Sequence, residues 1–194
     1  MGTKSADGTS ILYPNLVDEL CAMNNGEYDE AVLTGGIGSG KTTAALYTTA
    51  YQLYKLSCYE SPHELYSLDP SSEIVFIFQS LHERTAKAVD YSRFRAMIEK
   101  SPYFREHFIF NKELESELRF PKRIIVRPVS GKDNAAIGQN VFGGIIDEIN
   151  FMAVTEKSKN ALEGGTYDQA VALYNSISKR RKSRFSIAGA MPGV

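Results

Sequence analysis

Hydrophobic positions along the chain alternate between short continuous runs and longer segments with helical spacing. The continuous runs are typical of buried parallel strands and lie at 31–34, 73–78 and 143–146. The helical segments contain good helix formers or apolar residues at helical spacing and lie at 11–23, 42–56, 81–100 and 167–177. Strands that alternate with helices predict an α/β fold, in which a mostly parallel sheet has helices on both faces.

The remaining segments have a weaker pattern. Residues 123–130 predict an extended strand that Pro128 interrupts, while 103–122 are aromatic and charged without a clear period. The chain has no internal repeat, low-complexity tract or linker, so 1–194 is predicted to form one domain behind a loose polar tail at 1–10.

The composition narrows the protein class. Hydrophobic residues make up 43% and charged residues 23% of the 194 positions, which argues against extended disorder. The net charge of −1 gives no global positive field, so a nucleic acid would need a local patch. Cys21 and Cys58 have no CxxC spacing, and the three histidines share no ligand spacing. No apolar run is long enough to cross a bilayer, so we expect an intracellular protein that does not contact a membrane.

A glycine-rich segment follows the first predicted strand. Residues 35–42 read GGIGSGKT and fit the phosphate-loop pattern G-x-x-x-x-G-K-[ST] at every position. Glycines let the backbone approach a phosphate closely and take positive φ, and the helix that follows adds partial positive charge at its N-terminus. The residues predicted to bind a nucleoside triphosphate are Gly35, Gly36, Gly38, Ser39, Gly40, Lys41, Thr42 and Thr43.

Four of these residues have distinct predicted roles. Lys41 is expected to bind the β- and γ-phosphates, and the Thr42 hydroxyl is expected to be a ligand of Mg²⁺. Ser39 and Thr43 offer backbone amides to the phosphates. A glycine-rich turn that only joins a strand to a helix is the alternative, and the Lys-Thr pair argues against it.

A pair of acids follows the apolar run at 143–146. Phosphoryl transfer needs one carboxylate for the Mg²⁺ shell and another that orients or deprotonates the attacking water. We therefore assign Asp147 to the metal and Glu148 to the catalytic base. By itself such a pair would be read as a solvated strand end, but the phosphate loop favours the functional role. The N-K-x-D motif expected of small GTPases is missing, which favours ATP as the nucleotide.

Together, the phosphate loop, the segment 133–138 and the acidic strand end resemble the ATPase domain of a bacteriophage large terminase. In that family, a stretch of small residues that ends in glycine precedes the acidic strand, and an aromatic residue follows the acid pair. Gly138 and Phe151 stand at these two positions here. The resemblance implies a RecA-like P-loop fold of the additional-strand type. It also implies a Mg²⁺-dependent ATPase motor that assembles into a ring and drives double-stranded DNA into a capsid. A portal protein and a small terminase subunit would be its partners in the host cytoplasm.

The end of the chain is similar to the coupling motif of terminases and helicases. Residues 185–190 predict a final strand of small residues, and Ser186 is the candidate that links hydrolysis to movement. A buried strand followed by a Pro-Gly turn is an equally good interpretation. The nuclease domain of the family would lie beyond this motif, so the chain is expected to be an isolated ATPase domain or a fragment.

Two positions depart from the terminase pattern. Many terminases place an arginine immediately before the glycine that is Gly138 here, and this chain has Ile137. The phosphate loop also lacks the early basic residue of several terminases. A trans-acting arginine finger therefore cannot be assigned, and the nearby candidates are Arg119, Arg123, Arg127 and Lys132.

Two lesser signals complete the prediction. The basic run at 179–182, with Arg184, could contact DNA phosphates, although cations are favoured at any helix C-terminus. Tyr13 and Pro14 could flank the adenine. The expected function is thus a viral DNA-packaging ATPase, and the alternatives are a helicase or other P-loop motor and an ATP-dependent switch.

Overall fold

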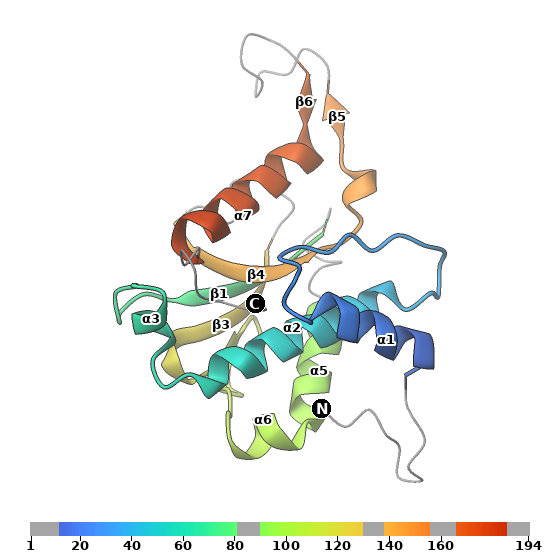
Figure 1. Ribbon diagram of the computed structural model, residues 1–194. Helices are drawn as coiled ribbons and strands as arrows, with labels where there is room; N and C mark the ends of the chain where they lie inside the picture. The colour runs from blue at the N-terminus through green and yellow to red at the C-terminus, as the bar shows by residue number, and fades with distance from the viewer. Residues whose placement is uncertain (1–11, 81–89, 130–137, 156–165, 186–194) are drawn as a thin grey trace.

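A four-stranded sheet organises the chain (Figure 1). The computed structural model describes residues 12–80, 90–129, 138–155 and 166–185. The helices are α1 (Pro14–Met23), α2 (Lys41–Cys58), α3 (Pro62–Leu65), α5 (Ser92–Lys100), α6 (Pro102–Glu106) and α7 (Gln169–Phe185), with short 3₁₀ turns at Pro121–Arg123 and Ile149–Phe151. The strands are β1 (Ile74–Gln79), β2 (Leu118–Arg119), β3 (Ile124–Val129), β4 (Asn140–Ile146), β5 (Val154–Thr155) and β6 (Tyr167–Asp168).

The sheet is mixed and mostly parallel. Its order is β2-β3-β1-β4, in which β1 runs parallel to both β3 and β4, and β2 is antiparallel to β3. The short strands β5 and β6 form a separate antiparallel pair. The predicted α/β class with a mostly parallel sheet is confirmed.

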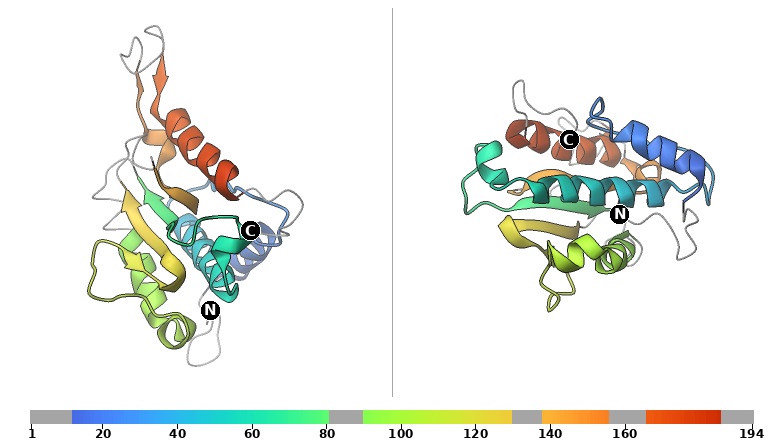
Figure 2. Two further views of the ribbon diagram at one scale, coloured as in Figure 1. Left: turned by 90° about the vertical axis from the view of Figure 1, so that its left-hand side faces the viewer. Right: turned by 60° about the horizontal axis from the view of Figure 1, so that its bottom comes forward.

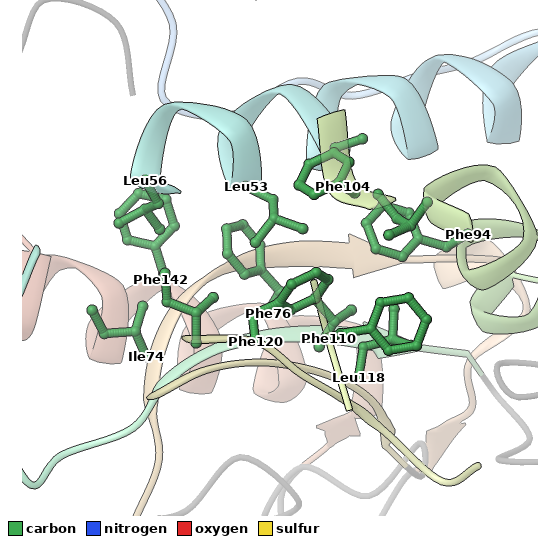
Figure 3. Close-up of a cluster of buried hydrophobic side chains, with 14 of the residues drawn as sticks. Leu53, Leu56, Ile74, Phe76, Phe94, Phe104, Phe110, Leu118, Phe120 and Phe142 are labelled. Carbon is green, nitrogen blue, oxygen red and sulfur yellow. The ribbon is translucent and has the colours of Figure 1, made fainter. Parts of the chain in front are cut away.

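Residues of β1 alternate between the two faces of the sheet, and helices pack on both. Ile74, Phe76 and Phe78 join the main core, into which Leu53 and Leu56 of α2 and Phe94 of α5 also point (Figure 3). On the opposite face, Val75 and Ile77 form a smaller cluster against which Ile177 of α7 packs. In Figure 2, α7 lies beside β4 and apart from α5 and α6.

A bulge and a close backbone approach mark β4. The register shifts after Val75, so that Phe76 pairs with Gly143 and the Phe142 ring lies 5.3 Å from that of Phe76. Gly144 has φ +152°, and a Cβ atom there would lie 1.9 Å from the carbonyl oxygen of Ile77. Glycine is required at this position because no side chain can occupy that space.

Pro128 does not end β3. It pairs with Phe78 of β1, while β2 extends only as far as Val126 on the other side. On the side away from β1, Pro128 therefore has no neighbour among the described strands. Its missing N–H costs no hydrogen bond on that side.

The prediction of a strand at 31–34 is wrong. These residues form no strand, and Val32 is 88% exposed. The apolar run is short and no described strand pairs with it, so its composition alone could not place it in the sheet. Phe185 also differs from the prediction, because it is the last residue of α7 and not the first of a strand.

Candidate functional site

The glycine-rich loop leads directly into the first turn of α2. Gly35, Gly38 and Gly40 have positive φ values of +144°, +82° and +87°. Gly40 is the N-terminal cap of α2, and its carbonyl accepts a 2.8 Å hydrogen bond from the amide of Ala44. The loop is exposed up to Ser39, so its backbone is accessible to a ligand at the positive end of the helix dipole.

The Lys41 ammonium group lies over the loop. Its Nζ donates 2.7 Å hydrogen bonds to the carbonyl oxygens of Gly35 and Gly36, and Ser39 Oγ lies 3.4 Å away. The amide of Ser39 donates to the Gly36 carbonyl at 3.4 Å. The cation is thus held beside the glycines by hydrogen bonds to two carbonyl groups of the loop.

Helix α2 begins near the carboxyl ends of the parallel strands. Leu56, near the end of α2, packs in the same cluster as Ile74 at the start of β1 (Figure 3). At the other end of α2, Thr43 Oγ1 accepts a 3.4 Å hydrogen bond from Arg93 Nη2, which follows β1 in the chain. The helix and β1 therefore run in opposite directions, as in a βα unit.

The acid pair extends from the end of β4. The amide of Asp147 donates a 2.8 Å hydrogen bond to the carbonyl of Gln79, which continues the parallel pairing one step beyond β4. Asp147 is half-buried, whereas Glu148 is exposed and adopts a left-handed backbone conformation at φ +55°. The two adjacent acids thus differ in burial and in backbone conformation, which is compatible with different roles for them.

Asp90 is a site residue that the sequence analysis missed. It is fully buried, and neither carboxylate oxygen has a hydrogen-bond partner among the described residues. Burial, together with the negative charges of Asp147 and Glu148, raises the pKa of Asp90 to about 7, although Arg93 opposes the shift. Asp90 follows β1 in the chain, and the effect of Asp147 and Glu148 on its pKa shows that it lies near the end of β4. The only signal in the sequence was an acid inside an otherwise amphipathic segment, which is common in helices.

Helix α1 packs against the phosphate loop. A Cβ atom on Gly40 would lie 3.3 Å from Leu16 of α1, and Asn24 at the end of α1 donates a 3.1 Å hydrogen bond to Thr48 of α2. Tyr13, just before α1, is 81% exposed. Its predicted role beside the adenine stays a prediction.

The segment before the loop is held by the last helix. Arg181 forms a 3.0 Å ion pair with Asp29, and Tyr174 donates a 2.6 Å hydrogen bond to Glu30. Ser178 also donates to Glu30 at 3.2 Å. These contacts fix the segment that precedes the phosphate loop against α7. One of them uses Arg181, which belongs to the basic run predicted to contact DNA.

This chain matches the family model of the N-terminal P-loop domain of uncharacterized protein MJ0330 over residues 10–191. It belongs to that family. The searches of the curated proteins and of the solved structures each gave no match. The match extends over nearly the whole chain, so the glycine-rich segment is the phosphate loop of a P-loop domain, which indicates nucleotide binding.

The two predicted ligands of Mg²⁺ lie at the ends of α2 and β4. Thr42 supplies a hydroxyl in the first turn of α2, and Asp147 supplies a carboxylate at the strand end. Within the described ranges, no group of three or more histidine, cysteine, aspartate or glutamate residues could hold a metal ion. Mg²⁺ commonly takes only one or two protein ligands and completes its shell with phosphate oxygens and water.

Several predicted residues lie away from the loop or outside the described ranges. Arg127 and Arg119 form ion pairs with Glu73, immediately before β1, at 3.1 and 3.3 Å. Arg123 lies just before β3. Ile137, Lys132 and Ser186 lie outside the described residues, so their predicted roles stay predictions. No described helix is both long and apolar enough to cross a membrane.

Proposed function

We propose that this P-loop domain binds ATP with Mg²⁺ and hydrolyses it. The observation that carries the proposal is the loop itself, in which three glycines take positive φ and Lys41, at the start of α2, donates to the carbonyl groups of Gly35 and Gly36. Membership in a P-loop family supports the nucleotide class. ATP is the proposed nucleotide because the sequence lacks the N-K-x-D motif.

Each of the proposed site residues has one role in phosphoryl transfer. Lys41 and the loop amides bind the phosphate oxygens. Thr42 and Asp147 would hold Mg²⁺, and this ion would neutralise the charge that develops on the phosphate oxygens. Glu148 orients a water molecule and takes its proton as the water oxygen forms a bond to the γ-phosphorus and the bond to the β-phosphate oxygen breaks. The exposed, left-handed turn at Glu148 supports this role because it leaves the carboxylate accessible to water.

A finer proposal concerns what hydrolysis drives. The resemblance to terminase ATPase domains, with Gly138 before β4 and Phe151 after the acid pair, suggests a motor that moves double-stranded DNA. Phe151 is 67% exposed, and Lys179, Lys182 and Arg184 are exposed along α7, so both an apolar and a basic surface are available for partners. Ring assembly, the portal protein and the small terminase subunit belong to this finer proposal.

The test is phosphate release from ATP by three proteins: the full chain, Glu148→Gln and Lys41→Ala. Glu148→Gln should still bind ATP but hydrolyse it more slowly by on the order of 10²–10⁴-fold, because only the base is lost. Lys41→Ala should lose ATP binding. Glu60→Gln is a matched control, because it removes an exposed carboxylate elsewhere.

The outcomes separate the two levels of the proposal. Hydrolysis that survives in Glu148→Gln would show that another group is the base, and a wild-type chain that binds no ATP would refute the proposed function. Activity that rises with protein concentration and with added duplex DNA would support the motor. ATP hydrolysis that responds to neither would favour a self-sufficient ATPase.

A further inference from the structure

One cation at the site has no assigned role. Arg93, in the first turn of α5, is exposed, and its Nη2 donates a 3.4 Å hydrogen bond to Thr43 Oγ1. The hydroxyl belongs to the residue that directly follows Thr42 of the phosphate loop. Helix α5 therefore brings a guanidinium group to the first turn of α2.

Other arginines with short contacts in the described part of the chain are already engaged. Arg95, two positions further on, pairs with Glu99 at 3.0 Å and donates to the carbonyl of Leu114 at 2.7 Å. Arg119, Arg127 and Arg181 each pair with at least one acid. Within the described ranges, Arg93 forms no ion pair within 4.0 Å, and one of the five N–H donors of its guanidinium bonds Thr43.

The charge of a nucleoside triphosphate favours a further cation at this position. The charge of Arg93 lowers the pKa of Asp90, against the effects of burial, Asp147 and Glu148, so the guanidinium interacts with that buried carboxyl group as well as with Thr43. A triphosphate carries more negative charge than Mg²⁺ and one lysine offset. An arginine beside Thr43 would supply further positive charge with planar donors that match phosphate oxygens.

We propose that Arg93 is a phosphate-binding residue that acts in cis, within the same chain as the loop at 35–42. The proposal rests on the proposed function and deepens it. It differs from the arrangement that the terminase resemblance implies, in which a neighbouring subunit supplies the arginine. Thr43 orients the guanidinium, and the remaining N–H groups bind the triphosphate.

The experiment is titration calorimetry of Mg²⁺ and ATP into the full chain and into Arg93→Ala, Arg93→Lys and Lys100→Ala. Arg93→Ala should weaken ATP binding by about 10- to 100-fold, as expected for charge-assisted hydrogen bonds. Arg93→Lys should recover only part of this loss, because an ammonium group cannot reproduce the planar fork. Lys100→Ala should bind within about twofold of the wild type, since it removes the same charge from the far end of α5.

Protein concentration distinguishes a cis from a trans role. The loss in Arg93→Ala should be the same at dilutions where sedimentation shows only monomer. A loss that appears only in assembled protein would overturn the cis assignment, as would a variant that binds ATP like the wild type.

Two controls keep the result interpretable. Thermal unfolding should change little in Arg93→Ala, because the side chain is exposed and makes one long hydrogen bond. If wild type binds ATP, Lys41→Ala does not, and Arg93→Ala is unchanged, only the inference on Arg93 fails. If the wild type binds no ATP, the proposed function fails and this inference fails with it.

Discussion

The two ends of β1 carry similar residues in opposite arrangements. Before β1, the charges are paired: Glu73 bonds Arg119 and Arg127, and Glu117 bonds the same two arginines. Beyond β1, Asp147 and Glu148 raise the pKa of Asp90, none of the three acids has an ion pair among the described residues, and the Asp90 carboxylate has no hydrogen-bond partner there.

The two ends of one sheet thus differ in how their charges are balanced. Paired charges satisfy each other, so the start of β1 needs no ligand. Neighbouring carboxylates repel one another, and a buried acid loses its hydration. The acids beyond the end of β1 therefore lower the free energy of unfolding. Such an arrangement is typical of a binding or catalytic site, where cations from a ligand relieve the repulsion.

The largest expected effect comes from the residue that holds β4 against β1. Gly144→Ala should destabilise the domain by on the order of 3–5 kcal/mol or prevent folding, because the new Cβ would overlap the Ile77 carbonyl. Chemical denaturation would measure it. Gly143→Ala is the matched control, since its Cβ would lie 3.7 Å from the Phe76 ring. Equal stability of the two variants would contradict the close approach.

Asp90→Asn tests the unpaired end. The pKa of Asp90 is raised from 3.8 to about 7 in the folded protein, so the native state holds this proton more tightly than the unfolded state. Its contribution to stability is complete below pH 4 and is lost as the pH rises towards 7. The unfolding free energy of the wild type, relative to Asp90→Asn, should therefore fall by about 2–4 kcal/mol between pH 4 and pH 8.

The control for this prediction is Asp18→Asn, which changes an exposed acid on α1. Urea denaturation at a series of pH values would give both curves. A difference between wild type and Asp90→Asn that does not vary with pH would show that the carboxyl group is ordinary and solvated.

Glu73→Gln tests the paired end and should have a smaller effect. It removes the partner of two arginines, but the Glu73 side chain is 32% exposed, so the expected loss is about 0.5–1.5 kcal/mol and should shrink in high salt. ATP affinity should not change. A loss of ATP binding in Glu73→Gln, measured beside Glu60→Gln, would mean that the two ends of β1 are not separate in function.

Much of the site was predictable because its motifs are local. The spacing from Gly35 to Thr42 predicts the loop and the helix after it, and α2 begins at Lys41, one residue before the predicted start. The acids after β4 were also found, because a strand end followed by carboxylates is readable from neighbouring positions. Asp90 and Arg93 were missed because their importance depends on how α5 packs against α2 and on which strand ends lie nearby.

The sequence by itself determined the α/β class, the phosphate loop and the acid pair, since each depends on residues close together in the chain. The tertiary structure decided which apolar runs enter the sheet, and the run at 31–34 is not among its described strands. It also decided that Gly144 is indispensable, that Asp90 is buried beside Asp147, and that Arg93 contacts Thr43. The physical reason is that strand pairing, burial and charge interactions join distant segments, and periodicity carries no information about which segments meet.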